Sequence, residues 1–405
     1  MKQNIGRIFA VKISISFVAQ FWGMAGFVVF FAAWLAHNGL SEFQIALILG
    51  VSQFVKSLFA PFAALFADGF KYKKTPILYM NFLGIISASA LYFVDEYVAI
   101  FIVTIFYSIS SSAIIPILDG LSMKGAEKLK FDYGHTRLWG SVSFMVAAIV
   151  CGILIDRWNL DLLLPWLLFG AVIALLAGLF LPVLPSSKMT KPRKVGTKSK
   201  RFDMDGALTL VKQPIFMAIL VAISIILASH SVYYGFSTIH WQKIGYSSDL
   251  IGILWAVGIV AEVLLFAYSS KFSLLLGPRR MIILGAAAAV IRWTITAFDP
   301  PLYLLFIAQL LHAFTFAATY LGALHLITRS VPEPLISTAM AINASLNAGI
   351  FMALAMFFGG LLYSEYSNWA YLFAAILAVV GLVFALGLKF IWDGQALVFE
   401  EIEEK

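Results

Sequence analysis

The chain has 405 residues, of which 61% are hydrophobic and only 12% are charged. A soluble domain carries roughly twice that charged fraction, so the composition excludes a string of soluble domains. The apolar runs are continuous and do not alternate with polar residues, which excludes a transmembrane β-barrel. A single cysteine, Cys151, excludes an internal disulfide framework and a cysteine-based metal site. We expect no metal, no other cofactor and no nucleic acid partner.

Twelve apolar runs follow one another along the chain, and each is long enough to cross a bilayer core of ~30 Å. The first is preceded by Lys2, Arg7 and Lys12, as in a secretory signal, but it is too long for a signal core and is predicted to remain as a helix. The predicted spans are 12–36, 43–66, 75–94, 97–122, 135–155, 162–183, 214–239, 248–270, 280–298, 301–327, 335–363 and 368–391.

The longest polar interruption separates spans six and seven and is rich in lysine and arginine. Together with the twelve apolar runs, this interruption predicts an all-α polytopic membrane protein made of two six-helix bundles. We expect an N-terminal bundle over 1–184, a basic cytoplasmic linker over 185–213, a C-terminal bundle over 214–392 and an acidic cytoplasmic tail over 393–405.

The distribution of charge between the loops predicts the orientation. Lysine and arginine gather at the N-terminus, in the linker and in alternate loops, whereas the intervening loops carry mainly acids. Because cytoplasmic loops are enriched in basic residues, both termini are predicted to be cytoplasmic, and the sequence is that of a multi-pass protein of a bacterial inner membrane. The acids on the predicted outer side are Glu42, Asp95, Glu96, Asp156, Asp161, Asp249, Asp299 and Glu365.

A few ionisable residues remain inside the predicted spans. Charges in hydrocarbon cost at least ~2.5 kcal/mol each, so they usually face a cavity and mark a pathway. Asp119 and Arg137 flank the loop 124–134 at similar shallow depth, which predicts an ion pair between neighbouring helices. Counting ~1.5 Å per helical residue places four others near the middle of the membrane: Lys56, Glu262, Arg292 and His312.

At these residues the sequence resembles the major facilitator superfamily, and within it the lactose-permease-like proton symporters, most closely the 3-phenylpropionate permease-like group. The resemblance covers the whole chain, with its most specific blocks at 132–141, 233–241 and 255–262. It implies two bundles around a central cavity. The superfamily's signature in the second loop appears at 64–74, with Ala64 in place of the usual glycine, and implies gating roles for Asp68, Lys73 and Lys74.

The resemblance also implies roles for the charges inside the spans. In lactose permease an acid of helix four pairs with a substrate-binding arginine of helix five, and Asp119 and Arg137 match them. Glu262, Arg292 and His312 match three residues of that permease involved in sugar binding and proton translocation. Four positions depart from its pattern: Thr315 replaces the proton-carrying glutamate, Gln309 and Ala348 replace two lysines, and Phe144 replaces the tryptophan that stacks on galactose.

These residues predict a proton-coupled symporter that works by alternating access around a site at the midplane. Burial favours the neutral form of a carboxyl group, so Glu262 is the candidate proton carrier, with Arg292 and His312 beside it. Arginine offers a fork suited to carboxylate, so the expected solute is a small aromatic monocarboxylate such as 3-phenylpropionate. The predicted solute-binding residues are Lys56, Asp119, Arg137, Trp139, Ser141, Phe144, Tyr233, Tyr234 and Trp255.

Other functions stay open at the level of sequence. The same architecture can carry a nucleoside or a sugar through Gln20, Ser141, Asn343 and Asn347, or export a compound instead of importing it. A channel or a receptor without transport coupling is a further class. A membrane-embedded enzyme is not expected, because the chain has no HExxH or GxSxG motif. We expect the partners to be a small solute, protons and the lipid bilayer, and the protein to act as a monomer.

Overall fold

The computed structural model describes residues 2–70, 72–183, 204–392, 395 and 397. In this part of the chain the regular structure is entirely helical, which confirms the predicted all-α class. The helices of the first half are α1 (Lys2–His37), α2 (Glu42–Asp68), α3 (Lys74–Ala90), α4 (Tyr97–Ser111), α5 (Ile114–Leu129), α6 (Tyr133–Arg157) and α7 (Leu163–Leu179).

The second half repeats this pattern with more interruptions. A short helix, α8 (Met204–Lys212), lies within the segment that the sequence assigns to the linker. The helices that follow are α9 (Pro214–Ala228), α10 (Ser231–Lys243), α11 (Ser248–Ala267), α12 (Ser269–Ala297), α13 (Leu302–Leu310), α14 (Thr319–Ser330), α15 (Ile336–Ala344), α16 (Met352–Tyr366) and α17 (Ala370–Ile391). Two π-helical segments, η3 (Ala313–Ala318) and η5 (Ser345–Phe351), join α13 to α14 and α15 to α16.

Eleven helical segments of the described chain are long and apolar enough to cross a membrane, and the last of them accounts for two spans. That segment, Thr338–Ile391, has 54 residues, which would extend ~80 Å as one helix, more than twice a bilayer core. It reverses at Ser367, whose φ of 52° is left-handed, and α16 packs against α17. The twelve predicted spans are therefore present in the fold.

Local sequence explains where the helices begin. Gly39 has a φ of 81° in the turn after α1, and Ser41 and Gln44 then form a capping box that starts α2. Asp132 caps α6 by accepting a hydrogen bond from the backbone N–H of His135 at 2.7 Å. Proline is the first residue of α9, where its missing N–H costs nothing.

Four of the predicted spans are broken within the membrane, which the hydropathy pattern does not reveal. Span 97–122 is divided between α4 and α5, and span 214–239 is divided at Ser229 and His230 between α9 and α10. Spans 301–327 and 335–363 each contain a π-helical segment. Broken helices and π-helical segments free backbone groups and commonly occur at functional sites of membrane transport proteins.

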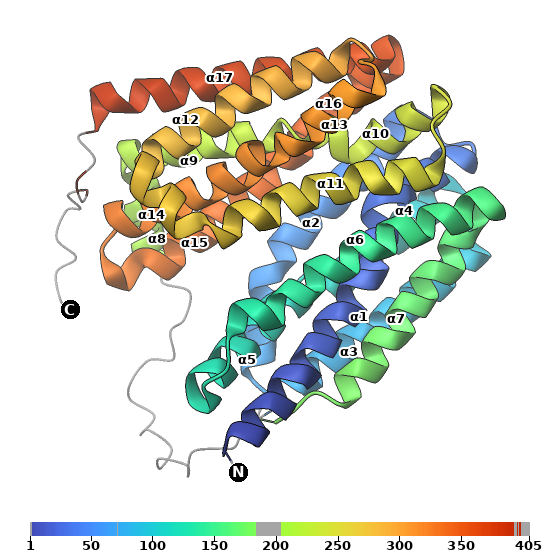
Figure 1. Ribbon diagram of the computed structural model, residues 1–405, viewed down its shortest axis with the longest axis horizontal. Coiled ribbons are helices and arrows are strands. Elements are labelled where there is room, and N and C mark those ends of the chain that lie inside the picture. The colour runs from blue at the N-terminus through green and yellow to red at the C-terminus, as the bar shows by residue number, and fades with distance from the viewer. Residues whose placement is uncertain (1, 71, 184–203, 393–394, 396, 398–405) are drawn as a thin grey trace.

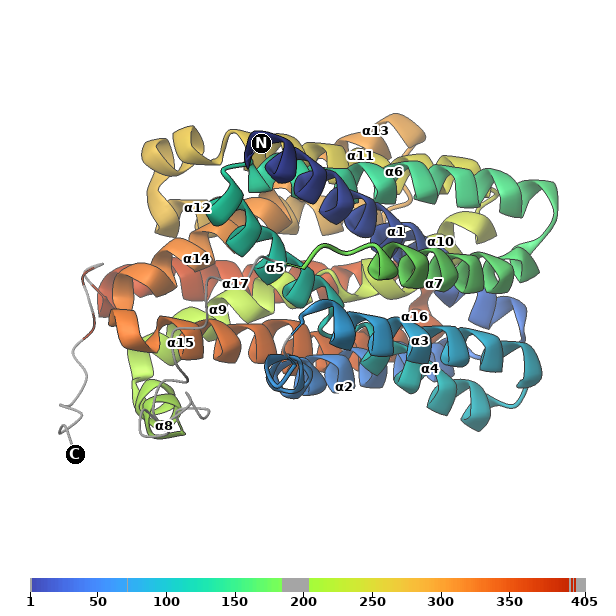
Figure 2. The same cartoon turned by 90° about the horizontal axis from the view of Figure 1, so that it is seen from below.

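The two halves of the molecule meet mainly along two pairs of helices. Figure 1 shows α1–α7 gathered on one side and α9–α17 on the other, and Figure 2 shows α6 beside α11 and α2 beside α16. Where α6 crosses α11, an added Cβ on Gly152 would overlap the carbonyl group of Ser248, so only glycine permits this approach. Between α1 and α10, Thr238 donates a hydrogen bond to the carbonyl oxygen of Val29 at 2.5 Å.

One end of this interface is fastened by a carboxylate. Asp156, at the end of α6, accepts hydrogen bonds from the backbone N–H groups of Ser248 and Asp249, both at 2.8 Å. These N–H groups belong to the first turn of α11, where they have no partner within the helix and where the helix dipole favours a negative charge. The carboxylate of one half therefore caps a helix of the other half.

Candidate functional site

A cavity of about 450 Å³ lies between the two halves. This is the size of a pocket for a small organic molecule. Helices α1, α2, α3, α4, α5, α6 and α7 supply one wall, and α10, α11, η3 and α16 supply the other. Its polar and aromatic lining residues include Gln20, Phe27, Ser52, Gln53, Lys56, Asn81, Tyr107, Ser108, Ser110, Ser111, Phe144, Tyr233, Tyr234, Trp255, Glu262, His312 and Phe316.

Three charged or ionisable residues predicted to lie near midplane come together on the C-terminal side of the cavity. Glu262 and His312 both line it, and Oε2 of Glu262 lies 3.3 Å from Nε2 of His312. On the other edge of the same imidazole, Nη1 of Arg292 donates to Nδ1 at 2.9 Å. The three residues come from α11, α12 and the junction between α13 and η3, so the fold forms a glutamate–histidine–arginine chain.

Arg292 is the member of this chain farthest from the cavity, and it lies in the core of the C-terminal half. It is 1% exposed, and its guanidinium also donates to Thr315 Oγ1 at 3.2 Å and to Gln309 Oε1 at 3.0 Å. Its carbon Cζ stands 4.8 Å from the ring centre of Tyr233 and 4.5 Å from that of Trp293, within cation–π range. Neutral oxygens, an imidazole nitrogen and aromatic faces thus hold this buried cation.

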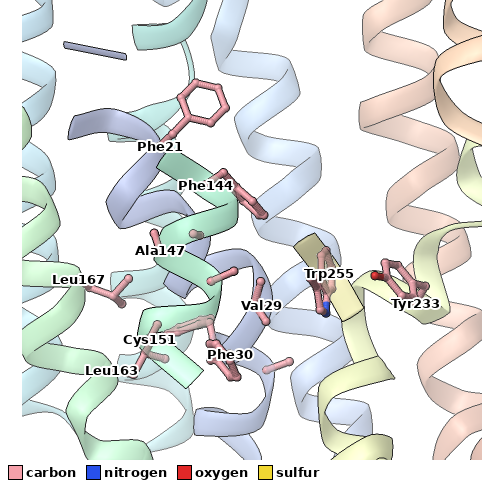
Figure 3. Close-up of a cluster of buried hydrophobic side chains, with 14 of the residues drawn as sticks. Phe21, Val29, Phe30, Phe144, Ala147, Cys151, Leu163, Leu167, Tyr233 and Trp255 are labelled. Carbon is pink, nitrogen blue, oxygen red and sulfur yellow. The ribbon is translucent and has the colours of Figure 1, made fainter. Parts of the chain in front are cut away.

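Aromatic rings form the surface around Glu262. The ring centres of Tyr233 and Trp255 are 4.6 Å apart, and those of Tyr234 and Trp255 are 6.0 Å apart. Tyr233 donates its hydroxyl hydrogen to Gln309 Oε1 at 3.0 Å, which fixes the ring against the group that holds Arg292. Figure 3 shows Phe144 extending from α6 toward the side on which Trp255 and Tyr233 lie.

The N-terminal wall is more polar, and its described residues include one cation. Lys56, on α2, is partly buried and lines the cavity. Among the residues that the structure describes, no carboxylate is paired with its ammonium group. Gln20 donates to Asn81 Oδ1 at 2.9 Å, and Ser108, Ser110 and Ser111 lie nearby on α4 in the same wall.

Asp119 and Arg137 form the predicted ion pair between α5 and α6. Nε of Arg137 lies 3.5 Å from Oδ1 of Asp119, and both side chains are 29% exposed. Tyr133 donates to the same carboxylate oxygen at 3.0 Å, and the Arg137 guanidinium stands 4.4 Å from the ring centre of Phe21. The described residues that line the cavity do not include this pair.

Several other predicted residues lie away from the cavity. Trp139 is 54% exposed and borders a separate surface depression formed with the first turns of α1. Ser141 is partly buried on α6, and Asn343 and Asn347 are buried on α15 and η5; none of the three is among the described lining residues. Their roles in binding stay predictions.

The predicted gating residues lie at the end of α2 and the start of α3. The side chain of Asp68 lies outside the described residues, as does Lys71. Lys73 donates to the carbonyl oxygen of Ala67 at 3.0 Å, which ties the start of α3 to the last turn of α2. Lys74 is the first residue of α3.

The structure also brings in His230, which the sequence interpretation did not select. Its ring is fully buried at the break between α9 and α10, and Nε2 lies 3.0 Å from Thr315 Oγ1. In the sequence, the only sign of this residue's importance is that it is a histidine inside an apolar span, three residues before Tyr233. Its partners lie on η3 and α12, far along the chain, so its role follows only from the fold.

Comparison with known proteins agrees with this architecture. Residues 10–375 match the MFS_1 like family. The chain is 28% identical over 373 residues to the "Probable 3-phenylpropionic acid transporter" of Escherichia coli (strain K12), covering 91% of this chain and 94% of that protein. It is 28% identical over 291 residues to the maltose permease of Geobacillus stearothermophilus, covering 70% of each. A crystal structure of a variant of the nucleoside transporter NupG superposes with a TM-score of 0.80 at 17% identity, covering 94% of this chain and 99% of that one.

Two halves built of long apolar helices around a cavity, together with the family match, define a secondary transporter of the major facilitator type, and its relatives are transporters rather than enzymes. The family match extends over most of the chain. The chain belongs to the MFS_1 like family, and it is a multi-pass membrane protein that transports a small solute.

Proposed function

We propose that this transporter is a proton-coupled symporter of a small aromatic monocarboxylate such as 3-phenylpropionate. The observation that carries the proposal is the position of Glu262. Its carboxyl group lies at the cavity wall, and His312, held in turn by Arg292, contacts it from the protein side. A site that exposes one ionisable group to both the solute and the solvent can exchange a proton in step with solute binding.

The environment of Glu262 suits a group that alternates between charged and neutral forms. Its side chain is 19% exposed toward the cavity, and Oε2 lies 3.3 Å from Nε2 of His312. Alternating access would open the cavity first to one side of the membrane and then to the other. The carboxyl group could then take up a proton on one side and release it on the other.

The solute class follows from the two walls of the cavity. Tyr233, Tyr234 and Trp255 offer ring faces on one side, and on the other Lys56 offers a cation that no described carboxylate pairs with. A buried cation is stabilised when an anion pairs with it, and an aryl group stacks on aromatic faces. The name of the Escherichia coli relative points to the same chemistry. Arg137 remains a second candidate for the carboxylate, with its present partner Asp119 as a competitor.

The decisive experiment measures uptake of radiolabelled 3-phenylpropionate into proteoliposomes with an imposed pH gradient. Wild-type protein should accumulate the acid. Glu262→Gln should retain exchange of labelled for unlabelled solute and lose accumulation, because a glutamine carries no proton. The exposed Glu127→Gln on α5 is the matched control and should behave like wild type. Full accumulation by Glu262→Gln would remove Glu262 from the coupling mechanism.

A nucleoside or a sugar is the second candidate solute, favoured by the polar N-terminal wall. Gln20, Asn81 and the α4 serines present amide and hydroxyl groups to the cavity, and such groups recognise sugar hydroxyls by hydrogen bonding. The names of the maltose permease and of the nucleoside transporter agree with this alternative. Inhibition of 3-phenylpropionate uptake by excess uridine or maltose, followed by uptake of the labelled competitor, would decide for it.

The cellular setting completes the proposal. The charge distribution of the loops supports a bacterial inner-membrane protein with both termini in the cytoplasm. We propose the bundles at 1–184 and 214–392, the linker at 185–213 and the tail at 393–405 as the working units of a monomer. In proton symport, an inward proton gradient would drive import of the solute.

A further inference from the structure

Behind the Glu262–His312 pair, buried donors and acceptors fix the position of one proton. Nη1 of Arg292 lies 2.9 Å from Nδ1 of His312, and a guanidinium can only donate hydrogen bonds. Nδ1 therefore carries the lone pair, and the imidazole proton is on Nε2, which lies 3.3 Å from the Glu262 carboxylate. In this arrangement His312 is a neutral hydrogen-bond donor to Glu262.

A second imidazole, that of His230, contacts Arg292 through the Thr315 hydroxyl. Nδ1 of His230 lies 3.0 Å from the carbonyl oxygen of Leu227, which only accepts, so this nitrogen carries the proton. His230 is fully buried and no carboxylate of the described structure contacts it, so its ring is neutral, because a buried charge requires a partner. Nε2 must then accept, and the Thr315 hydroxyl donates to it at 3.0 Å. The carbonyl of His312, at 3.4 Å from the same hydroxyl, is the more distant acceptor.

The Thr315 hydroxyl therefore has one defined orientation. Its hydrogen points to His230, and its oxygen receives an N–H of Arg292 at 3.2 Å. Both His230 and Thr315 are fully buried, and neither is among the described residues that line the cavity. Every bond runs in one direction, from Arg292 through Thr315 to His230 and on to the Leu227 carbonyl.

We propose that Thr315 and His230 are positioning residues that hold Arg292 on His312 and so keep the imidazole proton on Nε2. As long as Arg292 occupies Nδ1, His312 cannot take a second proton, and the transported proton is borne by Glu262. If Arg292 moves away, Nδ1 is free and His312 competes with Glu262 for that proton. This inference rests on the proton coupling proposed above for the same site.

Other titratable and charged groups lie near the bonded side chains of Glu262, His312 and Arg292, and they also contribute to any pH dependence of transport. Glu262 of α11 faces His312 directly. Arg137 lies on α6, the helix of the opposite half that packs against α11, and is paired with Asp119. Among the described residues, the other titratable groups near Arg292 and the two histidines are tyrosines of α10 and α17, namely Tyr233, Tyr234 and Tyr371.

The test compares two replacements of Thr315 with a matched control. Thr315→Val keeps the shape and removes the hydroxyl, whereas Thr315→Ser keeps the hydroxyl. Thr319→Val, one turn further on, removes another fully buried hydroxyl that has no hydrogen-bond partner in the described structure. If the valine variant does not fold, Thr315→Ala removes the same hydroxyl with less bulk.

The first readout is the ¹⁵N NMR spectrum of purified protein labelled at histidine, with signals assigned by single histidine replacements. Wild type, Thr315→Ser and Thr319→Val should show His312 protonated on Nε2 alone and His230 on Nδ1 alone. Thr315→Val should show His312 as a mixture of protonation forms. A proton on Nδ1 of His312 in the wild type, or identical spectra for the serine and valine variants, would overturn the inference.

The second readout is transport of 3-phenylpropionate as a function of pH. Thr315→Val should lower accumulation about tenfold, the effect of losing one hydrogen bond to a charged group, while exchange stays within about twofold of wild type. Thr315→Ser should restore the wild-type pH profile. If wild type itself does not accumulate the solute under a pH gradient, the proposed function fails, and the NMR result still decides the positioning role.

Discussion

Lys56 is the residue at which the solute class can be tested most directly. Its ammonium group lines the cavity without a carboxylate partner in the described structure, so an anionic solute would supply the missing charge. Lys56→Met should raise the KM for 3-phenylpropionate by roughly ten- to a hundredfold, because a charged hydrogen bond contributes about 1.5–3 kcal/mol. Lys56→Arg keeps the charge and should change the KM much less.

A neutral analogue provides the control for that prediction. The amide of 3-phenylpropionic acid lacks the negative charge, so its weak inhibition of uptake should be the same in wild type and Lys56→Met. An unchanged KM for the acid in Lys56→Met would assign the carboxylate to Arg137. In that case Arg137→Ala should abolish uptake, and Asp119, which now pairs with Arg137 at 3.5 Å, would compete with the solute.

The residue scale also shows what a single sequence can reveal about a site. Glu262, Arg292 and His312 could be selected because ionisable residues are rare in apolar spans, and their depths could be counted along each helix. His230 and the orientation of Thr315 could not, because their meaning depends on partners 85 residues apart. Likewise, Trp139 lies in one of the most specific blocks of the sequence, yet the helix turns it to the surface.

At the scale of elements, close packing of α17 against α9 depends on one small residue. An added Cβ on Gly381 would overlap the side chain of Ile226, which is fully buried on α9, whereas a Cβ on Gly387 of the same helix would meet nothing within 4 Å. Gly381→Ala should therefore destabilise the protein by about 1–3 kcal/mol through overpacking. Gly387→Ala should be neutral or slightly stabilising, because alanine is the better helix former.

Thermal unfolding in detergent measures this difference. We expect a Tm for Gly381→Ala several degrees below that of wild type and a Tm for Gly387→Ala equal to it or above it. Equal Tm values for the two variants would mean that α9 and α17 separate enough to accept the extra carbon, contrary to the packing observed.

Hydropathy predicts the number of membrane spans but not the breaks within them. The number of spans could be predicted because lipid leaves a helix no external hydrogen-bond partners, so each crossing requires a long apolar run. The breaks at Ser229–His230 and in η3 and η5 could not, because the residues on both sides remain apolar. A side chain from a neighbouring helix satisfies a backbone group freed in η5, where Gln53 of α2 donates to the carbonyl oxygen of Ala348 at 3.0 Å.

At the scale of the whole molecule, alternating access requires the two halves to part at one end and close at the other. Asp156 fastens the end that the loop charges place outside, by bonding two backbone N–H groups of α11. The predicted cytoplasmic counterpart involves Asp68, whose side chain lies outside the described residues. The balance between the two ends therefore depends in part on one exposed carboxylate.

Asp156→Asn should weaken this closure, because an amide can accept one of the two N–H groups but presents its own N–H₂ to the other. The loss of one hydrogen bond and of the charge at a helix N-terminus is worth about 1 kcal/mol, which shifts a two-state equilibrium roughly fivefold.

Spin labels at Arg157→Cys and Lys243→Cys, in a Cys151→Ser background, report the separation of the exposed ends of α6 and α10. The longer distances should gain population in Asp156→Asn relative to Asp95→Asn, an exposed acid on the same predicted side with no bond to α11. Distance distributions that are identical in the two variants would show that the Asp156 cap does not hold the halves together.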